Sequence, residues 1–572
     1  MNDDKAIQAL LNRIYGDDAG ERAFAEIRPV MERYAAKQSR KTDFFSHEDA
    51  ILITYGDSLN ASDHSPLSML DTFLNDFLTE AFSAVHILPF FPYSSDDGFS
   101  VIDFFTVNPG LGDWDDIRRI GRHRDLMVDF VLNHISSQSD WFQKYLNNDA
   151  GFEDLAIEAD DDDDLSQVVR PRTTPVCHSF EKDDGTMVNV WTTFSRDQVD
   201  LNYSSPRVLA LMLEVLLFYV ENGAAILRLD AVAYLWKEIG TTCIHLPQTH
   251  DMVKLFRAVL NVLSPDTVII TETNVPHHEN ISYFGNGVDE AQMVYNFTLP
   301  PLLVYTFIQG DTTELTRWAQ TLKTPSDQTT FFNFTASHDG IGVRPLEGIL
   351  SEQQIDLLVQ RTLANNGQVS YKSGPGGKKI PYELNTTYID ALSRPEDDDE
   401  IRALRFLASQ AIQMALPGVP GVYIHSLFGT RNWHEGVAQT GRARTINRKP
   451  LDFDHIVEAI KTPGTLTHRI FPAYVNMLKI RRRQPAFHPT ADFSVRLLSS
   501  DTMTIQRTCE RQTILAVTNV SADSVTVASP MHANNATMMM TDLINDMSYP
   551  TDKNDKINLA PFQTIWLADA VF

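Results

Sequence analysis

The chain has little of several features that would assign it to a particular class of protein. It contains three cysteines in 572 residues, Cys177, Cys243 and Cys509, too few and too widely spaced for a disulfide framework or a zinc site. No apolar run reaches the roughly 18 residues that a membrane-spanning helix requires. The first residues, MNDDKAIQAL, lack the basic region and the apolar core of a signal peptide. These absences predict a protein of the reducing cytoplasm.

The chain also has few basic residues relative to acidic ones. The chain has 48 lysines and arginines against 75 aspartates and glutamates, which gives a formal net charge of −27. Nucleic acids and anionic membranes would repel such a protein. The five consecutive aspartates at 160–164 are more typical of a solvated loop than of a metal site, because they cannot all face one ion. The composition therefore predicts a protein that binds neither nucleic acid nor membranes.

Strand and helix patterns alternate through most of the chain, as a parallel (β/α)8 barrel requires. Short apolar runs, many of them rich in β-branched residues, are the expected barrel strands. They lie at Ala50–Thr54, Ala84–Pro89, Leu126–Leu132, Ala224–Leu229, Val268–Thr271, Met293–Phe297, Phe331–Ala336 and Gly421–His425. We therefore predict an α/β fold built on a TIM barrel with two inserted domains and a small C-terminal antiparallel β domain.

Several stretches do not fit a simple strand-and-helix repeat. Apolar residues at helical spacing predict an N-terminal helical extension at 1–46. Two long gaps, after the third and the seventh strand, predict an inserted domain at 135–203 and a second, lid-like insertion at 340–395. Short β runs predict the C-terminal domain at 487–572. The barrel itself would then occupy 47–134, 204–339 and 396–486.

Polar side chains gather where four of the expected strands end. The heptapeptide 224–230, AAILRLD, places Arg228 and Asp230 on one face of a strand, where the guanidinium can hold the carboxylate ionised. The polar groups at the other three strand ends are Asn133, His134, Glu272, His338 and Asp339. A structural ion pair is the simpler explanation of AAILRLD alone. All four segments together indicate a catalytic site, because the carboxyl ends of barrel strands converge on one mouth.

These segments carry a resemblance to a known family. DFVLNH, RLDAV, TETN and ASHD look like the four signature regions of the α-amylase clan, glycoside hydrolase family 13. SSDDGFSVIDF, RPR, WTTFSRDQVDLNY, SHDGIGV and GRARTINRK resemble the sucrose phosphorylase subgroup. LWKEIGTTCIHLPQTH and TNVPHHENISYFGNG look like the branch that acts on glucosylglycerate or glucosylglycerol. The resemblance covers nearly the whole chain, from TYGD at Thr54 to INRK at Ile446.

The resemblance implies a retaining glucosyl transfer. Asp230 would be the nucleophile that forms a covalent glucosyl-enzyme, and Glu272 would be the general acid and base. Asp339 would grip sugar hydroxyls most tightly in the oxocarbenium-like transition state. The expected substrate-binding residues are Asp57, His134, Phe194, Gln198, Arg228, Tyr234, His338, Glu383 and Arg448.

The second nucleophile distinguishes phosphorolysis from hydrolysis. Phosphate must enter against two or three carboxylates, so a cation is needed beside the acceptor, and Arg172 corresponds to the phosphate contact of the subgroup. Glu383 stands where sucrose phosphorylases carry a glutamine, which argues against fructose. A carboxylate accepts hydrogen bonds from a neutral polyol and repels glycerate unless Arg344 or Lys237 offsets it. We therefore expect glucosylglycerol as the first candidate and glucosylglycerate as the second, followed by sucrose and sucrose 6′-phosphate.

The expected activity is reversible transfer of glucose from a small glucoside to inorganic phosphate, which gives α-D-glucose 1-phosphate. The resemblance implies no cofactor. Amylases often bind calcium near the position of Asn133, and the phosphorylase branch does not resemble them in this, so we expect no metal. A hydrolase or transglucosidase with the same three acids stays open as an alternative. A non-catalytic binding subunit is disfavoured, because such subunits lack one or more of the three acids. The oligomeric state stays open.

Overall fold

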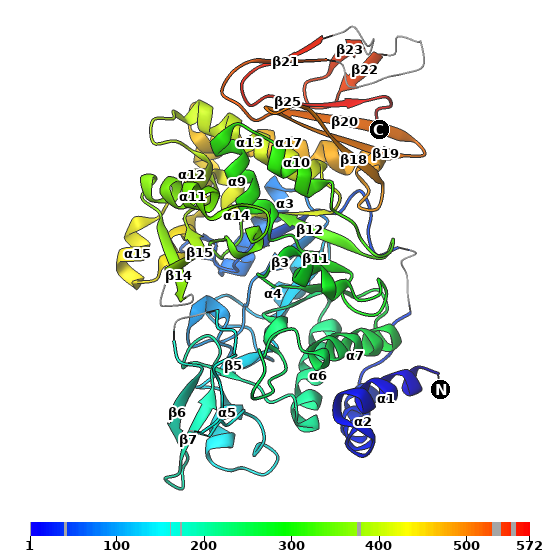
Figure 1. The fold of residues 1–572 in the computed structure, drawn as a ribbon, viewed down its shortest axis with the longest axis vertical. Coiled ribbons are helices and arrows are strands. Elements are labelled where there is room, and N and C mark those ends of the chain that lie inside the picture. The colour runs from blue at the N-terminus through cyan, green and yellow to red at the C-terminus, as the bar shows by residue number, and fades with distance from the viewer. Residues whose placement is uncertain are drawn as a thin grey trace.

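In the computed structural model, eight parallel strands form a closed barrel at the centre of the molecule (Figure 1). The structure describes residues 2–38, 43–160, 162–171, 174–373, 379–528, 539–550 and 556–572. In order around the barrel, the strands are β1 (Ile51–Thr54), β3 (Ala84–Ile87), β4 (Asp125–Phe130), β9 (Ala224–Leu229), β10 (Val268–Thr271), β11 (Met293–Tyr295), β12 (Thr330–Phe334) and β16 (Val419–Tyr423). β1 pairs with both β3 and β16, which closes the barrel. The predicted TIM barrel is confirmed.

The eighth strand departs from the prediction. β16 begins at Val419, before the expected start at Gly421, and helix α14 (Ile424–Phe428) begins before the expected end at His425. Pro420 reads as a strand breaker in the sequence, whereas its fixed φ is compatible with an extended strand. Gly421 faces the ring of Phe332, and a Cβ there would come within 2.3 Å of that ring. The glycine therefore marks close packing inside the barrel wall, not the beginning of a strand.

Helices surround the barrel and join its strands. They are α3 (Pro66–Phe77), α4 (Trp114–Ile120), α6 (Pro206–Glu221), α7 (Pro247–Leu263), α8 (His277–Asn280), α9 (Leu299–Gln309), α10 (Thr313–Ala319), α13 (Asp399–Ala415), α15 (His434–Thr440), α16 (Phe453–Lys461) and α17 (Leu466–Arg482). Shorter elements are β2 (Leu59–Asn60), η1 (Asp96–Gly98), η2 (Val232–Tyr234), η3 (Ile281–Phe284), η6 (Ala443–Asn447), β17 (Leu451–Asp452) and η7 (Pro485–Phe487). Two helices precede the barrel: α1 (Asn2–Tyr15) packs on α7, and α2 (Asp17–Glu32) packs on α6.

Two long connections leave the barrel at the carboxyl ends of β4 and β12. The first contains β5 (His134–Ser136), α5 (Asp140–Leu146), β6 (Cys177–Glu181), β7 (Met187–Trp191) and β8 (Gln198–Asp200). The second contains β13 (Ile341–Gly342), η4 (Arg344–Leu346), α11 (Glu352–Ala364), β14 (Gln368–Ser373), β15 (Lys379–Asn385) and α12 (Tyr388–Leu392). Because both begin at carboxyl ends of barrel strands, they flank the face of the barrel that carries active sites in this fold.

The last part of the chain forms antiparallel sheets, as predicted, at the top of Figure 1. Its strands are β18 (Asp492–Ser499), β19 (Thr502–Cys509), β20 (Gln512–Asn519), β21 (Val525–Ala528), β22 (Met539–Asp542), β23 (Met547–Pro550), β24 (Lys556–Leu559) and β25 (Thr564–Ala568). β18 packs on α10, and β20 packs on α13, so this unit is attached to the outside of the barrel.

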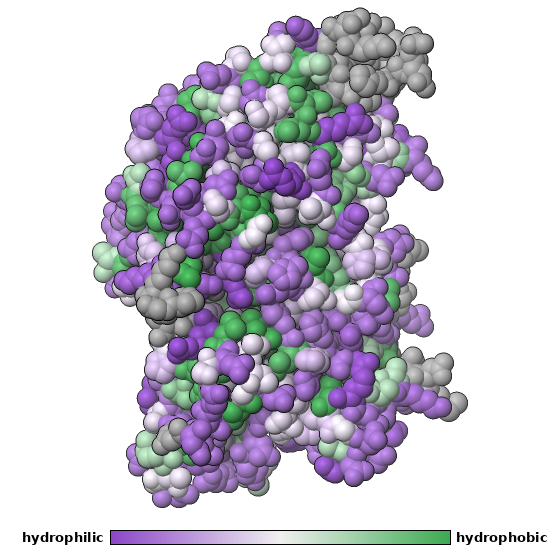
Figure 2. Space-filling view, in the orientation of Figure 1, coloured by the Kyte–Doolittle hydropathy of each residue, from purple (hydrophilic) through white to green (hydrophobic). Residues whose placement is uncertain are grey.

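The surface is largely polar. Figure 2 shows hydrophilic residues over most of the visible face, with hydrophobic residues in small separate patches. None of the described helices combines the length and the apolar character needed to span a bilayer.

Candidate active site

The carboxyl ends of β4, β9, β10 and β12 open into one cavity. The predicted site residues that line it are His134, Phe194, Gln198, Asp230, Tyr234, Glu272, His338 and Asp339. Phe99, Pro171, Asn274, Tyr382 and Arg444 line it as well. The fold thus brings together side chains that are separated by up to several hundred positions in the sequence.

Asp230 follows β9 and rests on a buried ion-pair network. Arg228 Nη1 donates to Asp230 Oδ1 at 2.7 Å and contacts Asp129 Oδ1 at 2.5 Å. His86 Nε2 lies 2.7 Å from the other oxygen of Asp129. Burial raises the pKa of Asp230, and the Arg228 guanidinium opposes this shift. Arg228 itself is 1% exposed and lies beneath the cavity, so it positions the carboxylate.

Glu272 follows β10, next to β9, and faces Asp230 across the strand ends. The residue after Asp230, Ala231, has a left-handed backbone with φ of 52°, and its N–H donates to Glu272 Oε2 at 3.2 Å. Arg228 Nη2 is 4.0 Å from the same oxygen. Burial, helped by the charges of Asp230 and Asp339, raises the pKa of Glu272 to about 7. A carboxyl with this pKa can both donate and accept a proton near neutral pH, as a general acid and base must.

Asp339 follows β12 and is held by arginines. Arg444 Nη1 lies 2.5 Å from Asp339 Oδ1, and Arg448 Nη2 lies 3.8 Å from the same oxygen. Burial opposes ionisation, but the guanidinium groups of Arg444 and Arg448 hold the pKa of Asp339 well below its ordinary value. Asn447 Nδ2 donates to the backbone carbonyls of Ser337 and Asp339, at 3.2 and 2.8 Å. These two hydrogen bonds hold the backbone of the loop that carries Asp339.

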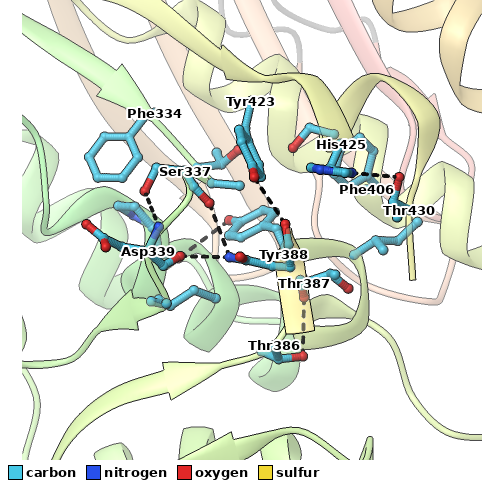
Figure 3. A pocket seen from close by; sticks show the side chains of 18 of the residues that line it. Phe334, Ser337, Asp339, Thr386, Thr387, Tyr388, Phe406, Tyr423, His425 and Thr430 are labelled. Atoms are coloured by element: carbon cyan, nitrogen blue, oxygen red, sulfur yellow. Dashed lines mark hydrogen bonds between the residues drawn. The ribbon is translucent and has the colours of Figure 1, made fainter. Parts of the chain in front are cut away.

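A second cavity lies behind this loop (Figure 3). It is bounded by the ends of β12 and β16 and by α12, and Ser337, Tyr388 and Tyr423 line it. Tyr423 donates from its hydroxyl to the Asn447 carbonyl at 3.1 Å. Asp339 lines both cavities, and none of the other residues expected to bind substrate lines this second one.

Aromatic and imidazole rings form part of the cavity wall. The Phe194 ring lies 5.2 Å from His134 and 5.5 Å from Tyr234. Phe99 stacks on His338 with ring centroids 4.8 Å apart, and burial lowers the pKa of His338 to about 3. His338 is therefore neutral and can donate or accept a hydrogen bond without adding charge.

Asp57 and Arg448 lie beside this cavity, not in its lining. Both border a neighbouring cavity, where burial raises the pKa of Asp57. Arg448 Nε donates to the His338 carbonyl at 2.7 Å, and its Nη1 pairs with Asp97. Arg172, the expected phosphate contact, lies outside the described residues. Its neighbour Pro171 lines the active-site cavity.

Glu383 differs from the expectation. It is 1% exposed, does not line the cavity, and accepts from Arg444 through both oxygens, at 2.9 Å from Nε and 2.6 Å from Nη2. Gly340 N also donates to Glu383 Oε1 at 3.2 Å. A carboxylate occupied in this way is not available to an acceptor hydroxyl, so the geometry argues against the polyol contact that we expected.

Lys237 and Arg344 also differ from the acceptor role that the sequence suggested for them. The Lys237 ammonium is buried between Asp200 Oδ2, at 2.5 Å, and Asn133 Oδ1, at 2.8 Å. Arg344 Nη2 lies 3.7 Å from Glu279 Oε2, and neither Arg344 nor Glu279 lines the cavity. Within the described ranges, no group of three or more His, Cys, Asp or Glu side chains is arranged to hold a metal ion.

Sequence reasoning missed Arg444, Asn274, Tyr382 and Phe99. Arg444 lies in GRARTINRK and Phe99 in SSDDGFSVIDF, two motifs that were recognised without a role for these residues. Asn274 is two positions after Glu272, and Tyr382 directly precedes Glu383. Closeness to a recognised acid was the signal that could have found the last two.

Comparison with known proteins identifies the group. The model of the α-amylase catalytic domain matches residues 76–350. The chain is 48% identical to glucosylglycerate phosphorylase from Spirochaeta thermophila, covering 84% of this chain and 83% of the relative. It is 44% identical to glucosylglycerate phosphorylase from Escherichia coli, covering 92% and 93%. The crystal structure of sucrose 6F-phosphate phosphorylase from Thermoanaerobacter thermosaccharolyticum superposes with a TM-score of 0.72 at 25% identity, covering 90% of this chain and 98% of that one. The chain therefore belongs to glycoside hydrolase family 13, in the sucrose phosphorylase group.

Proposed function

We propose that the protein is a glucosylglycerate phosphorylase, which transfers glucose reversibly from glucosylglycerate to inorganic phosphate with retention of the α configuration. The observation that carries this proposal is the identity of 44–48% to glucosylglycerate phosphorylases, against 31% to the glucosylglycerol phosphorylase of Marinobacter adhaerens. This reverses the order expected from the sequence, in which glycerol was the first candidate.

One contact in the structure supports the proposed order of acceptors. The preference for glycerol depended on a free carboxylate at Glu383 that would repel glycerate. Because Arg444 pairs with both oxygens of Glu383, that carboxylate is neutralised and withdrawn from the cavity. The cavity presents the guanidinium instead, which favours an anionic acceptor over a neutral one.

In the proposed reaction, Asp230 attacks the anomeric carbon while Glu272 protonates the departing oxygen of glycerate. The hydrogen bond from Arg228 to Asp230 favours the ionised form of the nucleophile and opposes burial, which raises the pKa of Asp230. In the second step Glu272, now ionised, accepts the proton of the incoming phosphate as it displaces Asp230. Asp339 binds glucose hydroxyls, and the wall of Phe194, His134 and Gln198 completes the glucose subsite.

An acceptor screen tests the proposal. With glucose 1-phosphate as donor, phosphate release should be fastest with glycerate and slower with glycerol, fructose and fructose 6-phosphate. In the other direction, release of α-glucose 1-phosphate from glucosylglycerate should require inorganic phosphate. Equal release of free glucose without phosphate would instead identify a hydrolase with the same acids, and a preference for glycerol would restore the first expectation.

A further inference from the structure

Arg444 is the only arginine or lysine among the described residues that line the active-site cavity. It lies on η6, and its side chain is 22% exposed. Two carboxylates hold it, Asp339 at 2.5 Å and Glu383 through the bidentate contact at 2.9 and 2.6 Å. A guanidinium has five N–H donors in a rigid fork. The hydrogen bonds to Glu383 occupy two of them, and the contact of Nη1 with Asp339 is an ion pair. The others are available to a ligand in the cavity.

The chemistry of the two acceptors gives this cation a common target. Phosphate carries negatively charged oxygens on the atom that bears its attacking oxygen. In a glycerate glucosylated at O2, the carboxylate is attached to the carbon that bears the reacting oxygen. Both acceptors therefore place negative charge within two or three bonds of the glycosidic oxygen, and glycerol does not.

We propose that Arg444 is the specificity-determining residue that binds the negatively charged oxygens of phosphate and of glycerate. Glu383 is its positioning residue: it is buried, fixes the plane of the guanidinium, and does not contact the acceptor. The claim that Arg444 binds glycerate rests on the proposed function. The claim that Arg444 binds phosphate requires only that the protein is a phosphorylase.

The other described cations near the cavity do not line it. Arg228 is buried, and its Nη1 contacts both Asp230 and Asp129. Arg448 is bound to Asp97 and to the His338 carbonyl. Lys237 and Arg344 have the partners described above. Because Asp230 and Asp339 line the cavity as carboxylates, an anion that enters it needs a cation on its own side, and Arg444 meets that requirement.

The experiment compares acceptors on one glucosyl-enzyme. With α-glucosyl fluoride as donor, KM and kcat are measured for phosphate, glycerate and glycerol in the wild type and in Arg444→Met, Arg444→Lys and Glu383→Gln. Because all three acceptors react with the same intermediate, any effect of Arg444 on Asp339 changes all of them alike. The ratio of KM for phosphate, or for glycerate, to KM for glycerol therefore reports the contact between Arg444 and the acceptor.

In Arg444→Met, KM for phosphate and for glycerate should rise about tenfold to a hundredfold relative to KM for glycerol, the range for loss of a hydrogen bond to a charged group. Arg444→Lys should recover part of the loss, because it keeps the charge without the fork. Glu383→Gln should change the same ratios in the same direction by less. The control is Arg405→Met, which removes a buried arginine paired with Asp397 away from the cavity and should leave all ratios unchanged.

Unchanged ratios in Arg444→Met would overturn the inference. A wild-type enzyme that does not use glycerate would refute the proposed function alone, and the ratio of phosphate to glycerol would still decide the role of Arg444. If the ratio of KM for phosphate to KM for glycerol rises equally in Arg444→Met and in Arg405→Met, the rise comes from a general loss of packing and the inference is wrong.

Discussion

Three carboxyl groups in one cavity have different electrostatic surroundings. Asp230 has a direct ion pair with Arg228, and Asp339 has one with Arg444. Glu272 has only a backbone N–H at 3.2 Å and a guanidinium nitrogen at 4.0 Å. Burial raises the pKa of Asp230 and of Glu272, and at Glu272, where compensation is weaker, it reaches about 7. The pKa of Asp339 is instead held well below its ordinary value, so the pKa values of Glu272 and Asp339 are separated. Such a separation assigns the proton donor among acids of similar intrinsic strength.

The pKa of about 7 at Glu272 predicts the pH dependence of glucoside cleavage. The raised pKa means that the carboxyl is protonated below about pH 7 and loses its proton above it. The kcat/KM for the proposed substrate, glucosylglycerate, should therefore fall about tenfold per pH unit above this value, because the leaving oxygen needs the proton. In Glu272→Gln with α-glucosyl fluoride, whose leaving group needs no proton, this limb should disappear. A limb that persists in that variant would assign the proton to another group.

Single residues could be predicted where a strand delivers them, and not where a distant partner decides their role. Asp230, Glu272 and Asp339 each end an apolar run, and they line one cavity. Glu383 and Arg444 are 61 positions apart, and nothing local in the sequence indicates that they pair. The sequence shows the charge of Glu383 but not its pairing with Arg444, and the proposed preference for glycerate over glycerol depends on that pairing.

Among the elements, Lys237 connects three segments around the active site. Its ammonium contacts Asp200 on β8 and Asn133 just after β4, while Lys237 itself follows η2 and the predicted nucleophile Asp230. Asp200 also accepts from the backbone N–H and the hydroxyl of Thr193, both at 2.7 Å. The connection after β4 is thereby attached to the loop that carries Asp230 and Tyr234.

Replacement of Lys237 by methionine should destabilise the protein by about 3–5 kcal/mol, because it leaves the buried Asp200 without its cation. The double variant Lys237→Met, Asp200→Asn should lose less. Urea unfolding measures both, and Lys254→Met, at a side chain that is 24% exposed, is the control. A change below about 0.5 kcal/mol in Lys237→Met, typical of a surface substitution, would show that the connection is not needed for stability.

The sequence predicts best those strands whose residues are buried on both faces, because they form continuous apolar runs. The barrel strands read as continuous apolar runs, and their positions follow from the sequence within a few residues. Strands β22, β23 and β24 were not predicted. They are short, and their described residues include exposed ones such as Met539 and Met547, so no apolar run marks them.

At the scale of the whole molecule, Arg481 joins parts of the chain that are far apart in sequence. It is fully buried on α17 and donates to the carbonyls of His47 and Asp49, which precede β1. It also donates to the carbonyls of Met414, Gly418 and Phe487, around the start of β16 and of the C-terminal sheets. One side chain thus holds together the first strand, the last strand and the C-terminal unit.

Arg481→Met should lower the free energy of unfolding by on the order of 3 kcal/mol, because several buried carbonyls lose their donor. The loss should appear as a lower midpoint of thermal unfolding, with a smaller loss in Arg481→Lys. Arg483→Met is the matched control. The Arg483 side chain is 63% exposed, and its one described ion pair is with Glu80, at 3.6 Å. Equal midpoints for Arg481→Met and Arg483→Met would contradict the assignment.

The closure of the barrel between β1 and β16 also determines when the protein can fold during its synthesis. β1 ends at Thr54, and its second partner begins at Val419. At roughly 5–20 residues per second, a ribosome needs about 20 to 75 s to make the intervening chain. During that time β1 has one edge without its native neighbour, and Arg481 has not yet been made. An exposed parallel edge attracts other strands, so the nascent chain has most need of protection from aggregation before its last quarter is translated.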